Sequence, residues 1–145
     1  QQQQKSNNNN NTIQFIPLDL NELLTKNKNI ITVLKENSNF NDNDTTIPTM
    51  IICEAVLFYL IPRAVQKLTQ QLFSLPNAER YCFTDNLSKV GVTPGPPMPI
   101  SARDKCNTWL ENNNKQLLEH DSIWGGAIHF VSATNNNNKE GEKIE

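Results

Sequence analysis

Runs of asparagine and glutamine interrupt this sequence and limit which part of it can form a packed core. The chain of 145 residues contains 22 Asn and 9 Gln, concentrated in residues 1–11, 37–43 and 135–138. Such amide-rich tracts lack the apolar side chains that a core requires. We therefore expect disordered tails at residues 1–11 and 134–145, and one folded domain over residues 12–133 that is long enough to bury a core.

The charge balance argues against two classes of partner. The net charge is -2, and no cluster of lysine and arginine offers the cationic surface that attracts nucleic acid or an anionic membrane. The longest apolar stretch, residues 50–61, is too short to cross a bilayer and contains Glu54. No secretory signal is recognisable. We expect neither nucleic acid nor a membrane as a partner.

The cysteine pattern argues against both a disulfide framework and a metal site. Cys53, Cys82 and Cys106 are odd in number and have no C-x-x-C spacing. Two of them lie in apolar runs, where a thiol behaves as a small hydrophobic side chain. This usage predicts reduced cysteines and a cytoplasmic location.

Apolar periodicity and turn residues predict alternating strands and helices. Asp19 with Glu22, and Ser101 with Asp104, have the spacing of capping boxes at helix starts. The closing hairpin has too short a connection for a parallel pair. This order indicates an α/β sandwich with a mainly parallel sheet and an antiparallel hairpin at its edge. The expected strands are 13–18, 49–53, 81–84, 116–120 and 127–131, and the expected helices are 20–36, 62–75 and 101–111.

A carboxylate directly follows each of the three expected parallel strands. These residues are Asp19, Glu54 and Asp85. In an open α/β sheet, the ligand crevice lies beyond the carboxyl ends of the strands. A carboxylate buried at a strand end is costly unless it has a hydrogen-bonding or cationic partner. The pattern suggests a ligand site at this edge of the sheet.

Two sequence blocks resemble a known enzyme family. Residues 15–20 read FIPLDL, and residues 47–60 read IPTMIICEAVLFYL. Both blocks, in this order, resemble the leucine carboxyl methyltransferase family, a branch of the class I S-adenosylmethionine-dependent methyltransferases. That family has a short strand ending in Asp-Leu and, later, Pro-Thr, an apolar strand, Glu and an apolar run ending in Tyr-Leu. The resemblance weakens across residues 91–100.

The resemblance implies an enzyme, a cofactor and part of its site. The fold would be a Rossmann-like class I methyltransferase sandwich, and the cofactor S-adenosyl-L-methionine. Asp19 and Leu20 would lie beside the adenine, and Glu54 would face the cofactor pocket. The reaction would be transfer of a methyl group to an acceptor that the sequence does not identify. A carboxylate acceptor would need no general base, because it is already anionic near pH 7.

The family's N-terminal half has no counterpart in this chain. Its Gly-rich turn after the first strand would have to precede Asp19, but all five glycines lie at Gly91 or later. The family's sheet order is 3-2-1-4-5-7-6, and this chain would supply strand three and strands four to seven. The missing half could then be on another polypeptide or belong to a longer gene, or residues 13–18 could dock directly against residues 49–53. An alternative function is a non-catalytic remnant that serves as an interaction or scaffolding module.

The three carboxylates also have structural interpretations. Glu54 could be a solvent-facing strand terminus or the partner of a helix dipole, although the family blocks favour the cofactor pocket. Asp19 could simply be the N-cap of the following helix, and both of its roles can hold together. For Asp85 the favoured role is to cap or turn the chain, because Asp-Asn dipeptides favour turns.

Other residues that could carry function have ordinary structural explanations. Phe58 and Tyr59 are expected to fill the space between sheet and helix. His120 and His129 lie on the closing hairpin, and we assign them no catalytic role. Residues 124–126 (WGG) are expected to form a turn. The sequence therefore leaves the catalytic residues unassigned.

Overall fold

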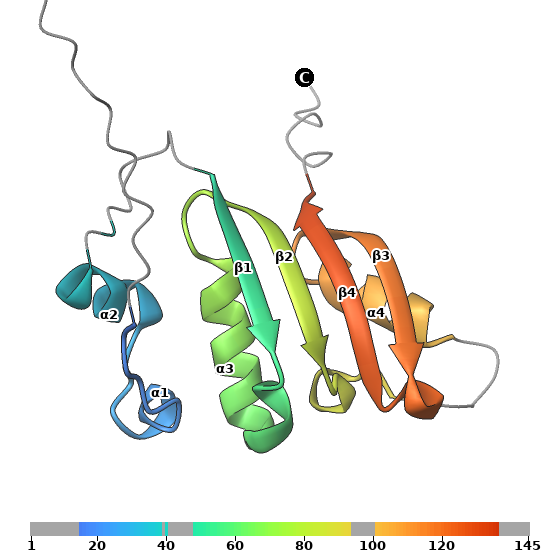
Figure 1. Cartoon of the computed structure of the whole chain (residues 1–145), viewed down its shortest axis with the longest axis horizontal. Helices are drawn as coiled ribbons and strands as arrows, with labels where there is room; N and C mark the ends of the chain where they lie inside the picture. Colours follow the sequence, from blue (N-terminus) through green and yellow to red (C-terminus); the bar gives the residue numbers. More distant parts are fainter. Residues whose placement is uncertain (1–14, 39, 41–47, 94–100, 137–145) are drawn as a thin grey trace, which may run out of the picture.

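The protein forms a four-stranded mixed sheet with helices packed against it (Figure 1). The computed structural model describes residues 15–38, 40, 48–93 and 101–136. The strands have the spatial order β1-β2-β4-β3, with β1 parallel to β2 and the other two neighbouring pairs antiparallel. They are β1 (Thr49–Glu54), β2 (Ala78–Asp85), β3 (Lys115–Ile123) and β4 (Ile128–Asn135).

The expected antiparallel hairpin is confirmed. The expectation of a mainly parallel sheet is wrong, because two of the three neighbouring strand pairs are antiparallel. β1, β2 and β3 point the same way in Figure 1, whereas β4 runs against them. Because β4 lies between β2 and β3, only one neighbouring pair is parallel. β4 extends to Asn135, two residues beyond the domain boundary that composition suggested.

The helices and short turns connect these strands in sequence order. No helix among the described residues has the length and hydropathy needed to cross a membrane. The helices are α1 (Glu22–Thr25), α2 (Ile30–Asn37), α3 (Pro62–Phe73) and α4 (Ala102–Glu111), and the 3-10 turns are η1 (Leu57–Tyr59), η2 (Ser88–Val90) and η3 (Trp124–Gly126).

Helices α3 and α4 pack against the same face of the sheet. Phe73 of α3 lies 5.2 Å from Tyr81 and 5.8 Å from Phe83 between ring centroids, and both of these β2 residues point to one face. Trp109 of α4 lies 5.4 Å from Phe83 and 5.5 Å from Phe73. Edge-to-face aromatic contacts of this kind stabilise a core beyond the area that they bury. This aromatic cluster joins both helices to β2.

Local sequence explains where α3 and α4 begin. Pro62 occupies the first turn of α3, where a missing N–H costs nothing. Ser101 caps α4: its hydroxyl accepts from the backbone N–H of Asp104, and the Asp104 carboxylate accepts from the backbone N–H of Ser101. The capping box expected at Ser101 and Asp104 is therefore confirmed.

The N-terminal segment differs from the prediction. Residues 15–18 form no strand, and residues 13 and 14 lie outside the described part of the chain. The expected helix over residues 20–36 is divided into α1 and α2, because Asn27 adopts a left-handed φ of 50°. Asn29 then caps α2 by accepting from the backbone N–H of Ile31. Asparagine favours such turns over a continuous helix.

Strand β1 is covered on one face only, although its continuous apolar run at residues 49–53 is typical of a strand buried on both faces. Ile51 and Cys53 point into the core, whereas Met50 is 57% exposed and Ile52 is 68% exposed. Among the described residues, β1 pairs with β2 alone. Within this part of the chain, its outer edge is therefore unpaired and one apolar face is exposed.

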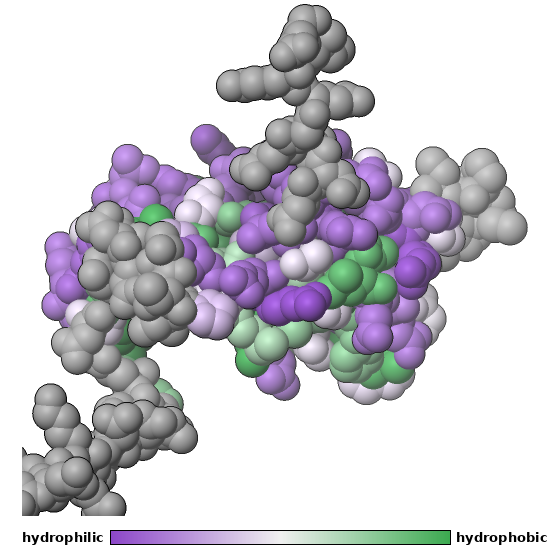
Figure 2. All heavy atoms as spheres, turned by 90° about the horizontal axis from the view of Figure 1, so that it is seen from above, coloured by the Kyte–Doolittle hydropathy of each residue, from purple (hydrophilic) through white to green (hydrophobic). Residues whose placement is uncertain are grey.

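The strands begin at one end of the sheet, and the candidate site lies at the other. Figure 2 looks from above onto the end where β1, β2 and β3 begin, where hydrophilic residues predominate among the coloured atoms and hydrophobic ones form smaller patches. The carboxyl ends of these three strands lie at the opposite end of the sheet (Figure 1). The apolar residues described in the next subsection lie at that carboxyl end.

Leu110 should be far more important for stability than Leu118. Leu110 of α4 is fully buried, whereas Leu118 of β3 is 36% exposed. Leu110→Ala should lower the free energy of unfolding by about 2–5 kcal/mol, because it removes buried contacts and leaves a cavity. Leu118→Ala should cost about 1 kcal/mol or less. Urea unfolding of both variants measures the difference, and equal losses would contradict the described core.

Candidate functional site

Asp85 joins the carboxyl ends of β1 and β2. It is the last residue of β2 and only 1% exposed. Its carboxylate accepts hydrogen bonds from the backbone N–H groups of Val56 (2.6 Å), Leu57 (2.6 Å) and Phe58 (3.0 Å). These donors belong to the segment that follows β1 and enters η1. A buried carboxylate is stable when several donors replace its water shell.

The expectation that Asp85 caps or turns the chain is confirmed, with an unexpected partner. Asp85 accepts from Asn86 in its own turn at 2.7 Å, but its main contacts are to a segment 27–29 residues earlier. The segment also turns sharply at Ala55, where φ is 50°. The backbone N–H of Ala55 donates to the carbonyl of Thr84 at 2.9 Å. Asp85 therefore acts as a structural anchor, and its oxygens are occupied.

A cavity of about 480 Å³ lies at this edge of the sheet. That volume is within the range of small-molecule sites. The carboxyl ends of β1 and β2 form one wall, and the connection between β3 and β4 forms the other. The lining residues are Glu54, Ala55, Phe58, Tyr59, Thr84, Asp85, Asn86, Ile123, Trp124, Ala127, Ile128 and Phe130.

Glu54 lies at the mouth of this cavity, directly after the buried part of β1. Its side chain is exposed and makes no hydrogen bond or ion pair with any described residue. Unlike Asp85, it can still accept from a ligand. The carboxylate that the sequence predicted at the end of this strand is therefore available as a hydrogen-bond acceptor beside a cavity.

Phe58 and Tyr59 line the cavity, so the prediction that they fill the core is wrong. Phe58 is 57% exposed and Tyr59 is 79% exposed, and their rings meet edge to face at 5.3 Å. The hydrogen bonds that Asp85 accepts from the backbone N–H groups of Leu57 and Phe58 hold the backbone of η1, from which these rings extend outward. The Asp85 contact is long-range, so local apolar pattern could not reveal this orientation.

The Trp-Gly-Gly segment forms the expected turn and also lines the cavity. Trp124, Gly125 and Gly126 all have left-handed φ values, of 52°, 64° and 86°. Glycine adopts this conformation without strain, whereas tryptophan does so at a cost. Trp124 is 78% exposed and faces the cavity that Glu54 borders. The sequence signal for this role was an aromatic residue before two glycines in a hairpin connection.

Asp19 and Leu20 do not belong to the lining of the cavity beside Glu54. Asp19 is exposed and accepts from the backbone N–H and the side-chain amide of Asn21, at 2.9 and 3.0 Å. The N-cap of α1 is Asn21, so the expected capping box of Asp19 with Glu22 does not form. Leu20 is partly buried and packs against the core. The structure therefore brings Glu54 and Asp85 together and leaves Asp19 in a separate turn.

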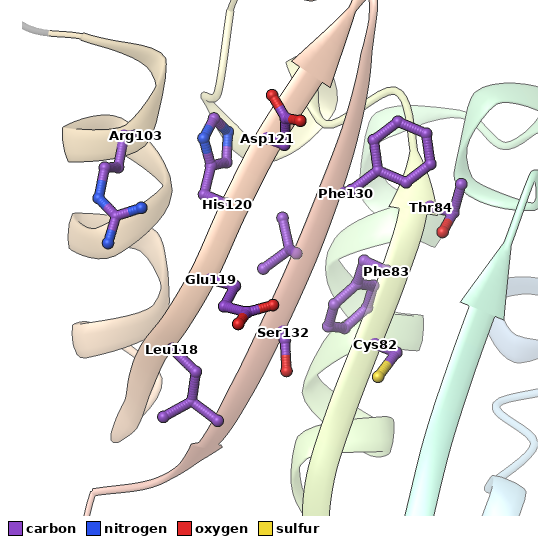
Figure 3. A pocket seen from close by; sticks show the side chains of 11 residues that line it. Cys82, Phe83, Thr84, Arg103, Leu118, Glu119, His120, Asp121, Phe130 and Ser132 are labelled. Atoms are coloured by element: carbon purple, nitrogen blue, oxygen red, sulfur yellow. The ribbon is translucent and has the colours of Figure 1, made fainter.

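A second cavity, of about 460 Å³, lies across β2, β4 and β3 (Figure 3). Its polar groups include Arg103 of α4 and Glu119, His120 and Asp121 of β3. His120 Nε2 lies 3.1 Å from Nδ1 of the buried His129. Burial lowers the pKa of both histidines; Arg103 adds to the effect at His120, and His120 adds to it at His129. Both shifts favour the neutral form of the pair.

The cysteines and the metal-binding residue types form no further site. None of the three cysteines forms a disulfide, and burial raises the pKa of Cys53 and of Cys106 to about 12. Such thiols are unreactive near neutral pH. In the described ranges, no group of three or more His, Cys, Asp or Glu is placed to hold a metal ion.

Comparison with known proteins assigns neither a family nor a function to this site. No protein-family model, curated protein or solved structure matches the chain. A functional proposal therefore depends on the arrangement of the strands and on the residues around the cavities.

Asp85→Asn should destabilise the fold strongly. The amide keeps the shape of the side chain but loses the charge that three backbone N–H groups contact. We expect the free energy of unfolding in urea to fall by about 3 kcal/mol. Asp121→Asn is the matched control, since Asp121 is exposed and, among the described residues, accepts a hydrogen bond from its neighbour Ser122 alone. A loss below about 0.5 kcal/mol at Asp85 would refute its anchoring role.

Stability should fall as the pH decreases from 7.5 to 5.5. The unfolded chain takes up protons on its histidines near pH 6.5, whereas the folded chain resists protonation because both pKa values are lowered. The unfolded state then binds more protons, so lower pH favours it. The chain has only these two histidines, and His120→Gln should flatten the profile. Urea unfolding at several pH values measures this, and a flat profile in the unmodified chain would contradict it.

Proposed function

We propose that residues 12–133 form the C-terminal half of an S-adenosylmethionine-dependent methyltransferase of the leucine carboxyl methyltransferase family. The order of the strands is the observation that carries this proposal. If β1 to β4 correspond in sequence order to strands four to seven, the observed order β1-β2-β4-β3 is 4-5-7-6. That is the C-terminal part of the family order 3-2-1-4-5-7-6. Chain order alone does not require the last two strands to exchange places, so the agreement supports a Rossmann-like class.

The position of Glu54 supports a cofactor site at the same edge. Ligands of α/β sheets bind beyond the carboxyl ends of parallel strands, and Glu54 ends β1 beside the cavity. Its unpartnered carboxylate suits the amino group of the methionine part of S-adenosyl-L-methionine. The cofactor supplies an activated methyl group, and the protein mainly aligns donor and acceptor for in-line displacement.

We retain Asp19 and Leu20 as proposed adenine contacts, in a different part of the site. The two residues lie outside the lining of the cavity beside Glu54, so they would contact another portion of the cofactor. Asp19 is exposed, and it accepts hydrogen bonds from the nearby Asn21 that a ligand can replace. The family likeness by itself leaves the acceptor open, with a carboxylate as one candidate.

The outer edge of β1, which no described strand pairs with, supports a missing N-terminal half as partner. An unpaired strand edge with apolar residues beside it favours pairing with a further strand. Met50 and Ile52 are exposed on this strand, and residues 15–18 form no strand that pairs with it. The half would come from another polypeptide or from a longer form of this chain. The cysteines without disulfides support a cytoplasmic location, and the charge balance argues against nucleic acid or a membrane as partner.

The same open edge favours one alternative function. Without a Gly-rich turn before Asp19, the chain could be a non-catalytic remnant that presents β1 to another protein. In that case the sheet would act as an interaction or scaffolding module. Binding of S-adenosylhomocysteine, the demethylated cofactor, would favour the methyltransferase over the remnant.

The purified chain should bind S-adenosylhomocysteine, the demethylated cofactor, in a calorimetric titration at millimolar concentration. Glu54→Ala should weaken this binding by about 10- to 100-fold, since a hydrogen bond to a charged group contributes roughly 1.5–3 kcal/mol. Glu79→Ala provides the control, because Glu79 is an exposed carboxylate near the opposite end of β2. Absence of heat with the unmodified chain would exclude cofactor binding by this chain alone and would favour the remnant.

A further inference from the structure

One face of the sheet carries no helix within the described part of the chain. Helices α3 and α4 pack on the face that carries Tyr81 and Phe83, and α1 and α2 contact α3. Successive side chains of a strand point to opposite faces, so Cys82 and the residues in register with it belong to the other face. We call this second face the open face; its members include Met50, Ile52, Cys82, Ser132, Glu119 and Asp121.

The register of the four strands places one row of side chains across the middle of the open face. Ile52 of β1 is paired with Cys82 of β2, which is paired with Ser132 of β4. Ser132 is paired in turn with Glu119 of β3. Directly opposite residues of neighbouring strands point to the same face. Cys82 and Ser132 have small side chains and line the cavity of about 460 Å³ (Figure 3). The row therefore has an apolar end, a hollow centre and an acidic end.

The apolar end of the row suits an apolar partner. A strand with one face in water ordinarily alternates apolar and polar residues. Strand β1 instead has apolar side chains on both faces, because Ile51 and Cys53 enter the core while Met50 and Ile52 are 57% and 68% exposed. Adjacent exposed apolar side chains of this kind mark surfaces at which another chain or segment packs.

The acidic end of the row suits a basic partner. Glu119 and Asp121 are both exposed, and among the described residues Asp121 accepts only a local backbone hydrogen bond. Neither carboxylate forms an ion pair with a described residue, although Arg80 and Arg103 lie on or beside this face. Lys115 of β3 is directed to the helix-covered face, over the aromatic rings there. Basic side chains of a partner would therefore complement this end in charge.

One α-helix is wide enough to contact both ends of the row. Neighbouring strands lie about 4.8 Å apart, so β1 and β3 are separated by roughly 14 Å. A helix with its side chains is about 10–12 Å wide, and a lysine side chain on its flank extends farther. A helix centred over Cys82 and Ser132 can approach closely, because these side chains are small. It would contact Ile52 on one flank and Glu119 on the other.

We propose that the open face binds one amphipathic helix of the missing N-terminal half. The helix directs apolar side chains toward Met50 and Ile52 and basic side chains toward Glu119 and Asp121. This inference rests on the proposed function, which supplies the missing half. It adds the surface that the half covers and the chemistry of the segment that covers it. The same helix would shield the thiol of Cys82 at the centre of the row.

Two designed helical peptides of about 18 residues, roughly 27 Å long, test the charge preference. Both carry the same stripe of leucines, and one carries lysine where the other carries glutamate along one flank. Fluorescence anisotropy with the full chain should show the lysine peptide binding about tenfold more tightly, because the glutamate peptide meets like charges. Glu119→Gln should reduce this preference about threefold. Glu111→Gln, an equal change of charge at an exposed position of α4, should leave it unchanged.

Labelling of Cys82 locates the bound peptide. Cys53 and Cys106 are buried, whereas Cys82 is partly exposed and lines the hollow. A maleimide should therefore modify Cys82 first, and Cys82→Ser identifies that reaction by removing it. A saturating concentration of the lysine peptide should slow the labelling of Cys82 several-fold, because the helix covers the thiol.

Any of three results would overturn the inference. The two peptides could bind equally tightly or not at all, Glu119→Gln could leave the preference unchanged, or bound peptide could leave the labelling of Cys82 unchanged. Sedimentation of the chain alone adds a check, since self-association that shields Cys82 would assign the face to a second copy instead.

The two proposals can fail separately. A chain that binds S-adenosylhomocysteine but not the lysine peptide retains the proposed function and loses the helix-binding face. A chain that binds the lysine peptide but not S-adenosylhomocysteine retains that face and favours the interaction module as its function.

Discussion

The hydrogen bonds from residues 56–58 to the Asp85 carboxylate are the contact on which the site depends. They connect the end of β2 to the segment after β1, so two parallel strands share one fixed edge. A buried carboxylate in this position is stable only because several backbone donors surround it. The contact turns Phe58 and Tyr59 outward and leaves Glu54 available. The wall of the cavity that η1 forms depends on this anchor.

The arrangement of helices gives the sheet two different faces. α3 and α4 both contact the face of β2 that carries Tyr81 and Phe83, so one face of the sheet contains the aromatic core. The opposite face of β1 remains exposed at Met50 and Ile52. An α/β sheet of the expected class has helices on both faces. The open face and edge of β1 are therefore where a further half of such a fold would pack.

The sequence predicted the elements better than it predicted the site. The strands at residues 49–53 and 81–84, the helix after Pro62 and the capping box at Ser101 were all readable, because strand and helix periodicity and capping are local properties. The division of the N-terminal helix was missed because the apolar periodicity continues across Asn27, whose left-handed conformation ends the first helix. The cofactor assignments for Asp19, Leu20 and Glu54 came from resemblance. Their geometry places only Glu54 beside the cavity.

The sequence by itself determined the order of strands and helices from residue 49 onward and a carboxylate at the end of β1 and of β2, because periodicity and spacing act over short distances. The tertiary structure alone decided which carboxylate was occupied and which was available. Asp85 and Glu54 look alike in the sequence, yet one is buried against distant N–H groups and the other is exposed. Trp124 and Tyr59 likewise face one cavity because β4 enters the sheet between β2 and β3. Such pairing joins segments that are far apart in the chain, and no local pattern encodes it.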